Sequence, residues 1–291
     1  MKIITNFINF PYYTYLCMKN CLVIRKYGYI GDLLMMTPAL KELSKTYKID
    51  LLIPEGYEGV FQNLDFIKDI CFNKDTINYD KIFDLNDYEF NYEQIYQTKI
   101  EKTKQELFAE ALNVKITDLK PLIILDKREL AWINNYLKDI NRKILLLAPK
   151  STDVSRDWSL NNWEDLIKKI KKMNYQIIIA DKNLQWNDND IIFFNNHSLR
   201  ELFSLVFKSN FVISHDSGLL HIAGAFDKYC LGIFGPTDPR YRAIYKNSYY
   251  VKEDIICSPC WYNRCENLTC MKNLKLDKVE NKLLEMMQNG N

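Results

Sequence analysis

A strand, a turn and a helix that could hold a diphosphate are encoded between residues 211 and 226. The apolar run at 211–213 predicts a buried parallel strand, residues 216–218 a turn, and residues 219–226 a helix. A helix N-terminus carries about half a positive charge and unpaired N–H groups, so it binds anions. Asp216 in the same turn places a carboxylate where sugar hydroxyls could contact it. Diphosphate and sugar together predict a site for a nucleotide-sugar donor.

A second candidate residue, Asp32, follows a glycine-bearing turn after the apolar run at 21–24. Its simplest role is to cap the helix that starts there. In two-domain α/β proteins, however, ligands lie at the carboxyl ends of the strands, and Asp32 has that position. A carboxylate facing the donor site could remove the proton of an acceptor hydroxyl. The residues alone leave both roles open.

Strands and helices alternate along the chain in the manner of parallel α/β domains, and 291 residues suit two such domains. We expect strands at residues 21–24, 50–53, 81–85, 144–148, 176–180, 191–194, 211–213 and 230–234. A polar, tyrosine-rich segment at 86–103 is followed by a helix from Lys104. Acceptor sites often lie in such insertions, and a solvated surface is the alternative for any single residue.

Four segments follow from this order. Residues 1–18 are expected to be an N-terminal extension, because Met18 directly precedes the first predicted strand and is a second candidate start. Residues 19–141 are expected to form an N-terminal Rossmann-like acceptor domain. Residues 142–274 would form a C-terminal donor-binding domain, and 275–291 a final helix.

The charge pattern bears on partners and location. The formal net charge is +2, from 39 basic and 37 acidic residues that are interspersed. This argues against nucleic acid, which usually requires a concentrated basic face. No apolar run approaches the ~20 residues that cross a bilayer. We therefore expect a cytoplasmic protein, with peripheral contact at the inner membrane as an additional prediction.

Several ordered motifs together resemble one family. They are Gly31-Asp32-Leu33-Leu34, Thr37-Pro38-Ala39-Leu40, Asp216-Ser217-Gly218-Leu219-Leu220-His221 and Phe234-Gly235-Pro236-Thr237-Asp238-Pro239. In type and order they are similar to glycosyltransferase family 9, the ADP-heptose:lipopolysaccharide heptosyltransferases. The resemblance implies GT-B architecture, in which two Rossmann-like domains face an interdomain cleft and the last helix returns to the N-terminal domain. It also implies an inverting transfer that needs no metal or other cofactor.

The resemblance implies roles for residues of the first two turns. Asp32 falls on the catalytic base position. Ser151 and Thr152 fall on hydroxyl positions beside the donor phosphates. The family usually has lysine before a Trp-Pro pair; here Arg156 holds the basic position and Ser159 replaces the proline. Arginine can still pair with phosphate, although a solvated loop cation is the alternative.

The third turn supplies most of the implied donor contacts. Asp216 falls on the position that contacts the sugar, and Ser217, Gly218 and Leu219 on the backbone cradle for the diphosphate. His221 could reach phosphate or pack beneath the turn. The acidic residue that binds the ribose would lie near Asp181, where the local match is poor.

A cluster of cysteines near the C-terminal end is a further candidate site. Four of the eight cysteines, Cys257, Cys260, Cys265 and Cys270, fall in one loop that opens with a CxxC pair. Four thiolates could complete a tetrahedral site for a structural zinc or iron ion. Free thiols packed in a loop are the alternative.

These features predict an enzyme that transfers a heptose or similar sugar from an ADP-activated donor to a hydroxyl of a saccharide or glycolipid acceptor, such as lipopolysaccharide core. A different class of protein stays open: a non-catalytic module that binds nucleotide or glycan and has a structural metal ion in its four-cysteine loop. The donor sugar, the nucleotide, the acceptor, the metal and the oligomeric state are not decided by the sequence.

Overall fold

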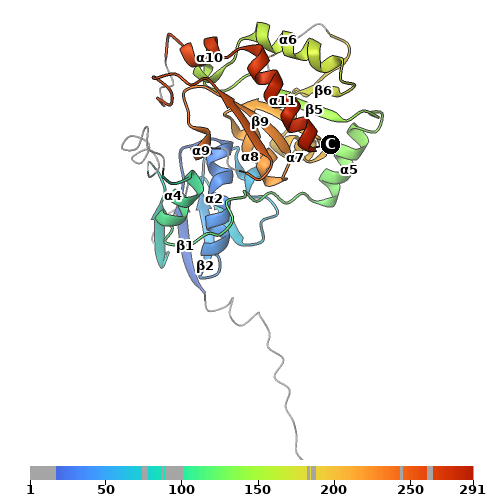
Figure 1. The fold of residues 1–291 in the computed structure, drawn as a ribbon. Helices are drawn as coiled ribbons and strands as arrows, with labels where there is room; N and C mark the ends of the chain where they lie inside the picture. Colours follow the sequence, from blue (N-terminus) through green and yellow to red (C-terminus); the bar gives the residue numbers. More distant parts are fainter. Residues whose placement is uncertain are drawn as a thin grey trace, which may run out of the picture.

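A computed structural model describes residues 18–73, 78–86, 88, 101–181, 184, 188–242, 245–260 and 265–290. The expected extension, except for Met18, lies outside these residues, as does most of the tyrosine-rich segment at 86–103. The described chain forms two parallel sheets, one above the other in Figure 1.

The first sheet has four strands in the order β3-β2-β1-β4. Its strands are β1 (Lys19–Ile24), β2 (Tyr47–Leu52), β3 (Ile67–Cys71) and β4 (Lys81–Asp84), all parallel. The long helix α2 (Ile30–Leu43) connects β1 to β2, with the short 3-10 helix η1 (Glu58–Val60) further on, and α4 (Lys104–Ala111) packs beside α2. Asp32 and Lys104 therefore lie on neighbouring helices.

Helix α2 continues through Pro38, which has no N–H to donate to the Leu34 carbonyl four residues earlier. The hydroxyl of Thr37 donates to that carbonyl instead, at 2.7 Å. The helix therefore reaches Leu43 without leaving the Leu34 carbonyl unbonded.

The second sheet has six parallel strands in the order β10-β9-β8-β5-β6-β7. They are β5 (Ile144–Ala148), β6 (Gln176–Ile179), β7 (Ile191–Phe193), β8 (Phe211–His215), β9 (Tyr229–Phe234) and β10 (Ser248–Lys252). The other elements are α5 (Lys127–Tyr136), η2 (Val154–Arg156), α6 (Leu160–Lys171), α7 (Leu199–Lys208), α8 (Gly218–Ala225), α9 (Pro239–Arg242), α10 (Thr269–Asn273) and α11 (Leu276–Gly290).

Helices cover both faces of this sheet, because successive residues of a strand point to opposite sides. In β5, Leu145 and Leu147 join the core beneath α6 and α11, whereas Leu146 and Ala148 join the core on the side of α7 and α8. The core on the side of α7 and α8 also includes residues of β1, β2 and α2, so it continues into the first sheet.

The last helix does not pack where the sequence led us to expect. Its apolar residues Val279, Leu283, Met286 and Met287 are buried against the second sheet, and α11 contacts β9, β10 and α6 (Figure 1). The expectation that residues 275–291 return to the N-terminal domain was wrong, because this apolar stripe is covered by strands of the C-terminal sheet. The boundaries at 18, 141 and 274 stay predictions; helix α5, before residue 141, packs on α7.

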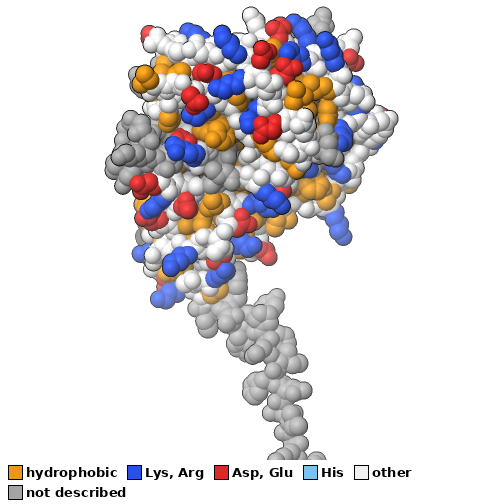
Figure 2. Space-filling view, viewed as in Figure 1, with side chains coloured by type: hydrophobic (Ala, Val, Ile, Leu, Met, Phe, Trp, Pro, Cys, Tyr) orange, Lys and Arg blue, Asp and Glu red, His pale blue; other side chains and the backbone are white. Residues whose placement is uncertain are grey.

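Two surface features match the composition. Basic and acidic side chains alternate over the face shown in Figure 2. Among the described residues, no helix combines the length and apolarity that a bilayer crossing requires.

Candidate functional site

A hollow of about 370 Å³ lies between the two sheets, where the turns after β1, β5 and β8 converge. The carboxyl ends of parallel strands gather at one edge of each sheet, which brings these turns together. Eight of the predicted site residues line it: Asp32, Ser151, Thr152, Arg156, Asp216, Ser217, Gly218 and His221. It is also lined by Lys104, Lys150 and Arg242, which were not among the predicted site residues.

The N-termini of α2 and α8 meet at this hollow. A Cβ atom added to Gly218 would lie 3.3 Å from the Ile30 Cβ, and one added to Gly31 would lie 2.7 Å from the His221 Cδ2. Glycine at both positions permits this close approach. Because each helix presents the positive end of its dipole here, the hollow favours an anionic ligand.

Tyr29, not Asp32, is the N-cap of α2. Asp32 lies at the third helical position, where its carboxylate bonds back to the N-cap backbone and also faces the hollow. Its Oδ2 accepts from the Tyr29 N–H at 2.9 Å, and its Oδ1 accepts from the Lys104 Nζ at 2.6 Å. The Arg242 guanidinium lies 3.7 Å from Oδ1. Burial by itself would raise the pKa of Asp32, but the charges of Lys104 and Arg242 outweigh it and hold the pKa well below its usual range. Asp32 is therefore a carboxylate at neutral pH.

Lys104 and Arg242 come from segments that carried no recognisable motif. Lys104 lies in the first turn of α4, which begins at a capping box formed by Thr103 and Glu106. Its side chain is only 4% exposed, although lysine is almost never fully buried unless it is paired. The sequence did predict a helix from Lys104 and an acceptor site in this region, but not that the lysine would reach Asp32.

The loop after β5 is held from behind by Asp157. The Asp157 carboxylate accepts from the Ser151 N–H at 2.8 Å and from the Lys150 Nζ at 3.0 Å. His215, fully buried, lies 3.9 Å from the same carboxylate and accepts from the Trp158 N–H at 2.9 Å. Burial lowers the pKa of His215 to about 3, so this ring is neutral. These contacts fix the loop that presents Ser151 and Thr152.

Arg156 faces the hollow and pairs with Asp216. Its Nη1 donates to the Asp216 carbonyl at 3.0 Å and lies 3.3 Å from the carboxylate oxygen Oδ2. Burial would raise the pKa of Asp216, but Arg156 and Arg242 hold it below its usual value. Arg156 is therefore in the binding hollow, and the alternative of a solvated loop cation does not describe its position.

The turn after β8 presents Ser217 and Gly218 but not Leu219 to the hollow. Ser217 is the N-cap of α8, and its hydroxyl accepts from the Leu219 N–H at 3.3 Å. The Leu219 side chain is buried in the core. Of the predicted backbone cradle, the N–H groups of Ser217 and Gly218 are thus the better placed to meet an anion.

A second hollow of about 560 Å³ adjoins the first, with Ile30 and Tyr57 lining both. Asp181, just after β6, lies on its wall together with Phe194 and His197. The two hollows provide space for a ligand longer than a diphosphate. The residue singled out as a candidate ribose contact lies in the second.

The cysteine loop does not form a metal site in the part of the chain that the structure describes. No group of three or more potential ligands there is close enough to hold an ion. Cys257 is exposed and Cys270 is buried, with residues 261–264 of the loop outside the described ranges. Burial, followed by the nearby thiols of Cys260 and Cys257, raises the pKa of Cys270. The described thiols are not gathered into a metal site, and the four-cysteine site stays a prediction.

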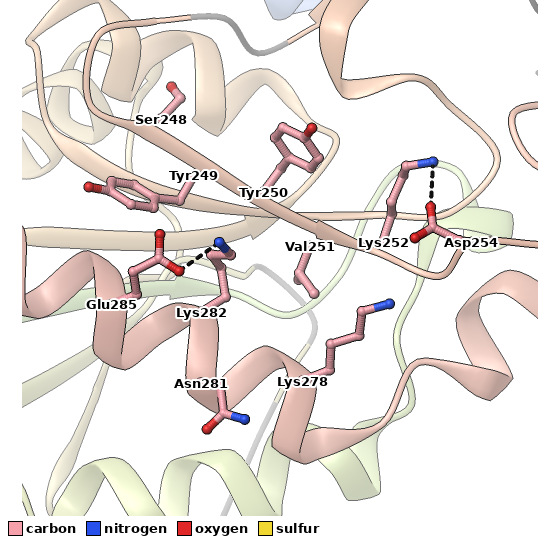
Figure 3. Close-up of a pocket in the computed structure, with 10 residues that line it drawn as sticks. All are labelled: Ser248, Tyr249, Tyr250, Val251, Lys252, Asp254, Lys278, Asn281, Lys282 and Glu285. Atoms are coloured by element: carbon pink, nitrogen blue, oxygen red, sulfur yellow. Dashed lines mark hydrogen bonds and ion pairs between the residues drawn. The ribbon is translucent and has the colours of Figure 1, made fainter.

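Another hollow, of about 630 Å³, lies between β10 and α11 (Figure 3). Its lysines are matched by carboxylates: Lys252 by Asp254 at 3.0 Å, and Lys282 by Glu285 at 2.7 Å. A third, Lys278, pairs with Glu253. Since its charges are neutralised locally and none of the predicted site residues reaches it, this hollow is not the candidate site.

The fold and the site define an α/β protein of GT-B architecture, with a hollow for an anionic ligand between its two units. A sequence profile of glycosyltransferase family 9 (heptosyltransferase) matches residues 78–271, which is more than half of the chain. The chain belongs to this family. The resemblance noted in the sequence and the predicted fold class are both confirmed.

Relatives and solved structures agree with this assignment. Lipopolysaccharide heptosyltransferase 1 of Pseudomonas aeruginosa is 24% identical over 58% of this chain, a match that spans only 49% of that relative. Lipooligosaccharide heptosyltransferase 2 of Campylobacter jejuni (serotype O:6) is 24% identical over 86% of this chain and 94% of its own length. The crystal structure of the iron-containing dodecameric glycosyltransferase TibC from enterotoxigenic E. coli superposes with a TM-score of 0.74 at 14% identity, covering 94% of this chain and 77% of that one.

Proposed function

We propose that this protein transfers a heptose or a similar sugar from an ADP-activated donor to a hydroxyl of a saccharide acceptor such as lipopolysaccharide core. The observation that carries the proposal is the gathering of Asp32, Arg156 and the α8 N-terminus in one hollow between the two units. The named relatives are heptosyltransferases, and TibC has been crystallised with ADP-D-β-D-heptose.

The charges around the hollow suit a diphosphate. Its lining contains four cationic side chains, Lys104, Lys150, Arg156 and Arg242, against the two carboxylates of Asp32 and Asp216. Fixed donors of this kind stabilise charge that develops on a leaving group without having to reorganise. We propose that Ser151, Thr152, Arg156 and the N–H groups of Ser217 and Gly218 hold the diphosphate. The adjoining hollow with Asp181 would take the nucleoside.

Asp32 would act as the general base. It lines the same hollow as the turn proposed to bind the diphosphate, and it is ionised at neutral pH. The acceptor oxygen attacks the anomeric carbon while its proton passes to the Asp32 carboxylate, and the bond to the diphosphate breaks. Attack from the face opposite the leaving group inverts the anomeric centre. Asp216 would orient the donor sugar.

The test separates a catalyst from a binding module. Isothermal titration with ADP and ADP-heptose should show binding to the wild type and to Asp32→Asn alike. Transfer or donor hydrolysis by Asp32→Asn should fall by about 10²–10⁴-fold, the usual contribution of general base catalysis. Binding without any turnover by the wild type would instead favour the non-catalytic module, and an active Asp32→Asn enzyme would remove Asp32 from the mechanism.

A further inference from the structure

A chain of buried hydrogen bonds runs from helix α4 to His221. The Gln105 Nε2 donates to the Tyr245 Oη at 3.2 Å, and the Tyr245 Oη lies 2.7 Å from the His221 Nδ1. The side chains of Gln105, Tyr245 and His221 are all buried, with exposed fractions of 1%, 8% and 2%. Gln105 directly follows Lys104, so one helical turn contacts both Asp32 and this chain.

The direction of the chain follows from its first member. The Gln105 Nε2 also donates to the Leu119 carbonyl at 3.1 Å, which fixes which end of the amide is the nitrogen. The Tyr245 oxygen therefore accepts from Gln105. Its single proton has no other bonded acceptor among the residues that the structure describes, so it points to the His221 Nδ1.

Both rings are neutral, which leaves one tautomer. Burial raises the pKa of Tyr245 well above its usual value, so the phenol keeps its proton. Burial is also the main cause that lowers the pKa of His221 to about 4. Because Nδ1 of a neutral imidazole accepts the Tyr245 proton, the ring proton must be on Nε2.

The Nε2 edge of His221 faces the candidate site. His221 lines the hollow, and a Cβ atom added to Gly31 would lie 3.2 Å from its Nε2. The N–H on Nε2 is thus at the place where the N-termini of α2 and α8 meet. An imidazole in the opposite tautomer would present a lone pair there and would repel an anionic oxygen.

We propose that Gln105 and Tyr245 are positioning residues that hold His221 in the Nε2–H tautomer, so that it donates a hydrogen bond to an anionic oxygen of the bound ligand. The identity of that ligand as a nucleoside diphosphate rests on the proposed function. The tautomer and the chain that fixes it do not.

The chain has only three histidines, which makes the tautomer measurable by two-bond ¹H–¹⁵N spectra of protein labelled at histidine. His215 is an internal reference: its Nε2 accepts from the Trp158 N–H, so its proton must be on Nδ1. We expect His221 to show the Nε2–H pattern and His215 the Nδ1–H pattern, with His197→Gln and His215→Gln assigning the signals. An Nδ1–H pattern for His221 in the wild type would overturn the proposal.

Tyr245→Phe removes one hydroxyl and tests the positioning. The His221 Nδ1 resonance should move toward that of a nitrogen without a hydrogen bond, while the His215 signals stay unchanged. Affinity for ADP and for inorganic pyrophosphate should fall about tenfold, as for a weakened hydrogen bond to a charged group. Tyr249→Phe is the matched control, because Tyr249 also has a bonded hydroxyl, accepting from Asn289, but lies in the distant hollow beside α11.

Gln105→Met provides a second variant if Tyr245→Phe does not fold, and its changes should be in the same direction. Unchanged affinity in a folded variant whose His221 spectrum has changed would show that the chain does not position a ligand contact. Failure of the wild type to bind ADP or pyrophosphate would refute the proposed function, and the wild-type spectrum would still decide the tautomer.

Discussion

Lys104→Met should change the acid limb of the pH–rate profile, because Lys104 is the nearest cation to the proposed base. At the observed 2.6 Å, the attraction between Lys104 and Asp32 is about 6 kcal/mol for an effective dielectric constant of about 20. Desolvation of both groups offsets much of this attraction. Arg242, at 3.7 Å from the same carboxylate, stays in place. We therefore expect the pKa of Asp32 to rise by about 1–3 units, the usual effect of one neighbouring charge.

The sign follows from linkage. The pKa of Asp32 is depressed in the folded wild type, so Asp32 contributes stability above the pKa of an unfolded aspartate, and this stability is lost as the pH falls through the folded value. In Lys104→Met about 1.4–4 kcal/mol of that contribution should be missing at pH 7. Urea unfolding of the variant and the wild type at pH 7 measures the difference. Below the pKa of an unfolded aspartate, about 3.9, the variant should lose less stability than the wild type.

The assay is kcat/KM for donor consumption from pH 4.5 to 9. The ratio of variant to wild-type activity should decrease at the acid end of this range, where the raised pKa lets Asp32 of the variant begin to take up a proton while Asp32 of the wild type stays ionised. Lys102→Met is the control: Lys102 is two residues away, about half exposed and paired with Glu110. A loss that is the same at every pH would refute the reasoning, since it would mean that Lys104 contacts the ligand without tuning Asp32.

Three further predictions follow from the geometry. Gly31→Ala should destabilise the protein by about 1–3 kcal/mol and reduce turnover, because the added Cβ would lie 2.7 Å from the His221 ring. Gly59→Ala is the control: its added Cβ would have its nearest atom at 3.5 Å, so its free energy of unfolding in urea should be almost unchanged. The free energy of unfolding should fall by roughly 2 kcal/mol for each of His215 and His221 between pH 7 and pH 5. Their folded pKa values are about 3 and about 4, so below pH 6.5 only the unfolded chain takes up protons at these residues. The free energy of unfolding of His215→Phe should depend less on pH, and an unchanged dependence would contradict this assignment. Transfer should survive EDTA if the cations around the hollow stabilise the leaving group. If magnesium restored activity to a metal-stripped, folded enzyme, that mechanism would be wrong. Elemental analysis of the purified protein decides whether the four-cysteine loop carries zinc or iron.

Local sequence patterns were enough to locate the turns that build the site. Buried parallel strands appear as short apolar runs, so the strands before Asp32, Ser151 and Asp216 were recognisable, and the hydrogen-bonding turns follow them directly. Since the carboxyl ends of parallel strands share one edge of a sheet, the three turns had to converge. Two of the four edge strands, β3 and β10, were missed. They are only partly buried, so neither has the continuous aliphatic run of a buried strand.

Tertiary structure decided the rest. Lys104, Gln105, Arg242 and Tyr245 belong to segments whose local sequence has no ligand-binding pattern. Long-range packing brings Lys104 and Arg242 to Asp32, and it brings Gln105 and Tyr245 to each other and to His221. The placement of α11 was likewise not encoded locally, because an amphipathic stripe specifies that a face will be buried but not which surface covers it. Local sequence therefore determined which residues could do the chemistry, and long-range packing determined their charge partners and the direction of their hydrogen bonds.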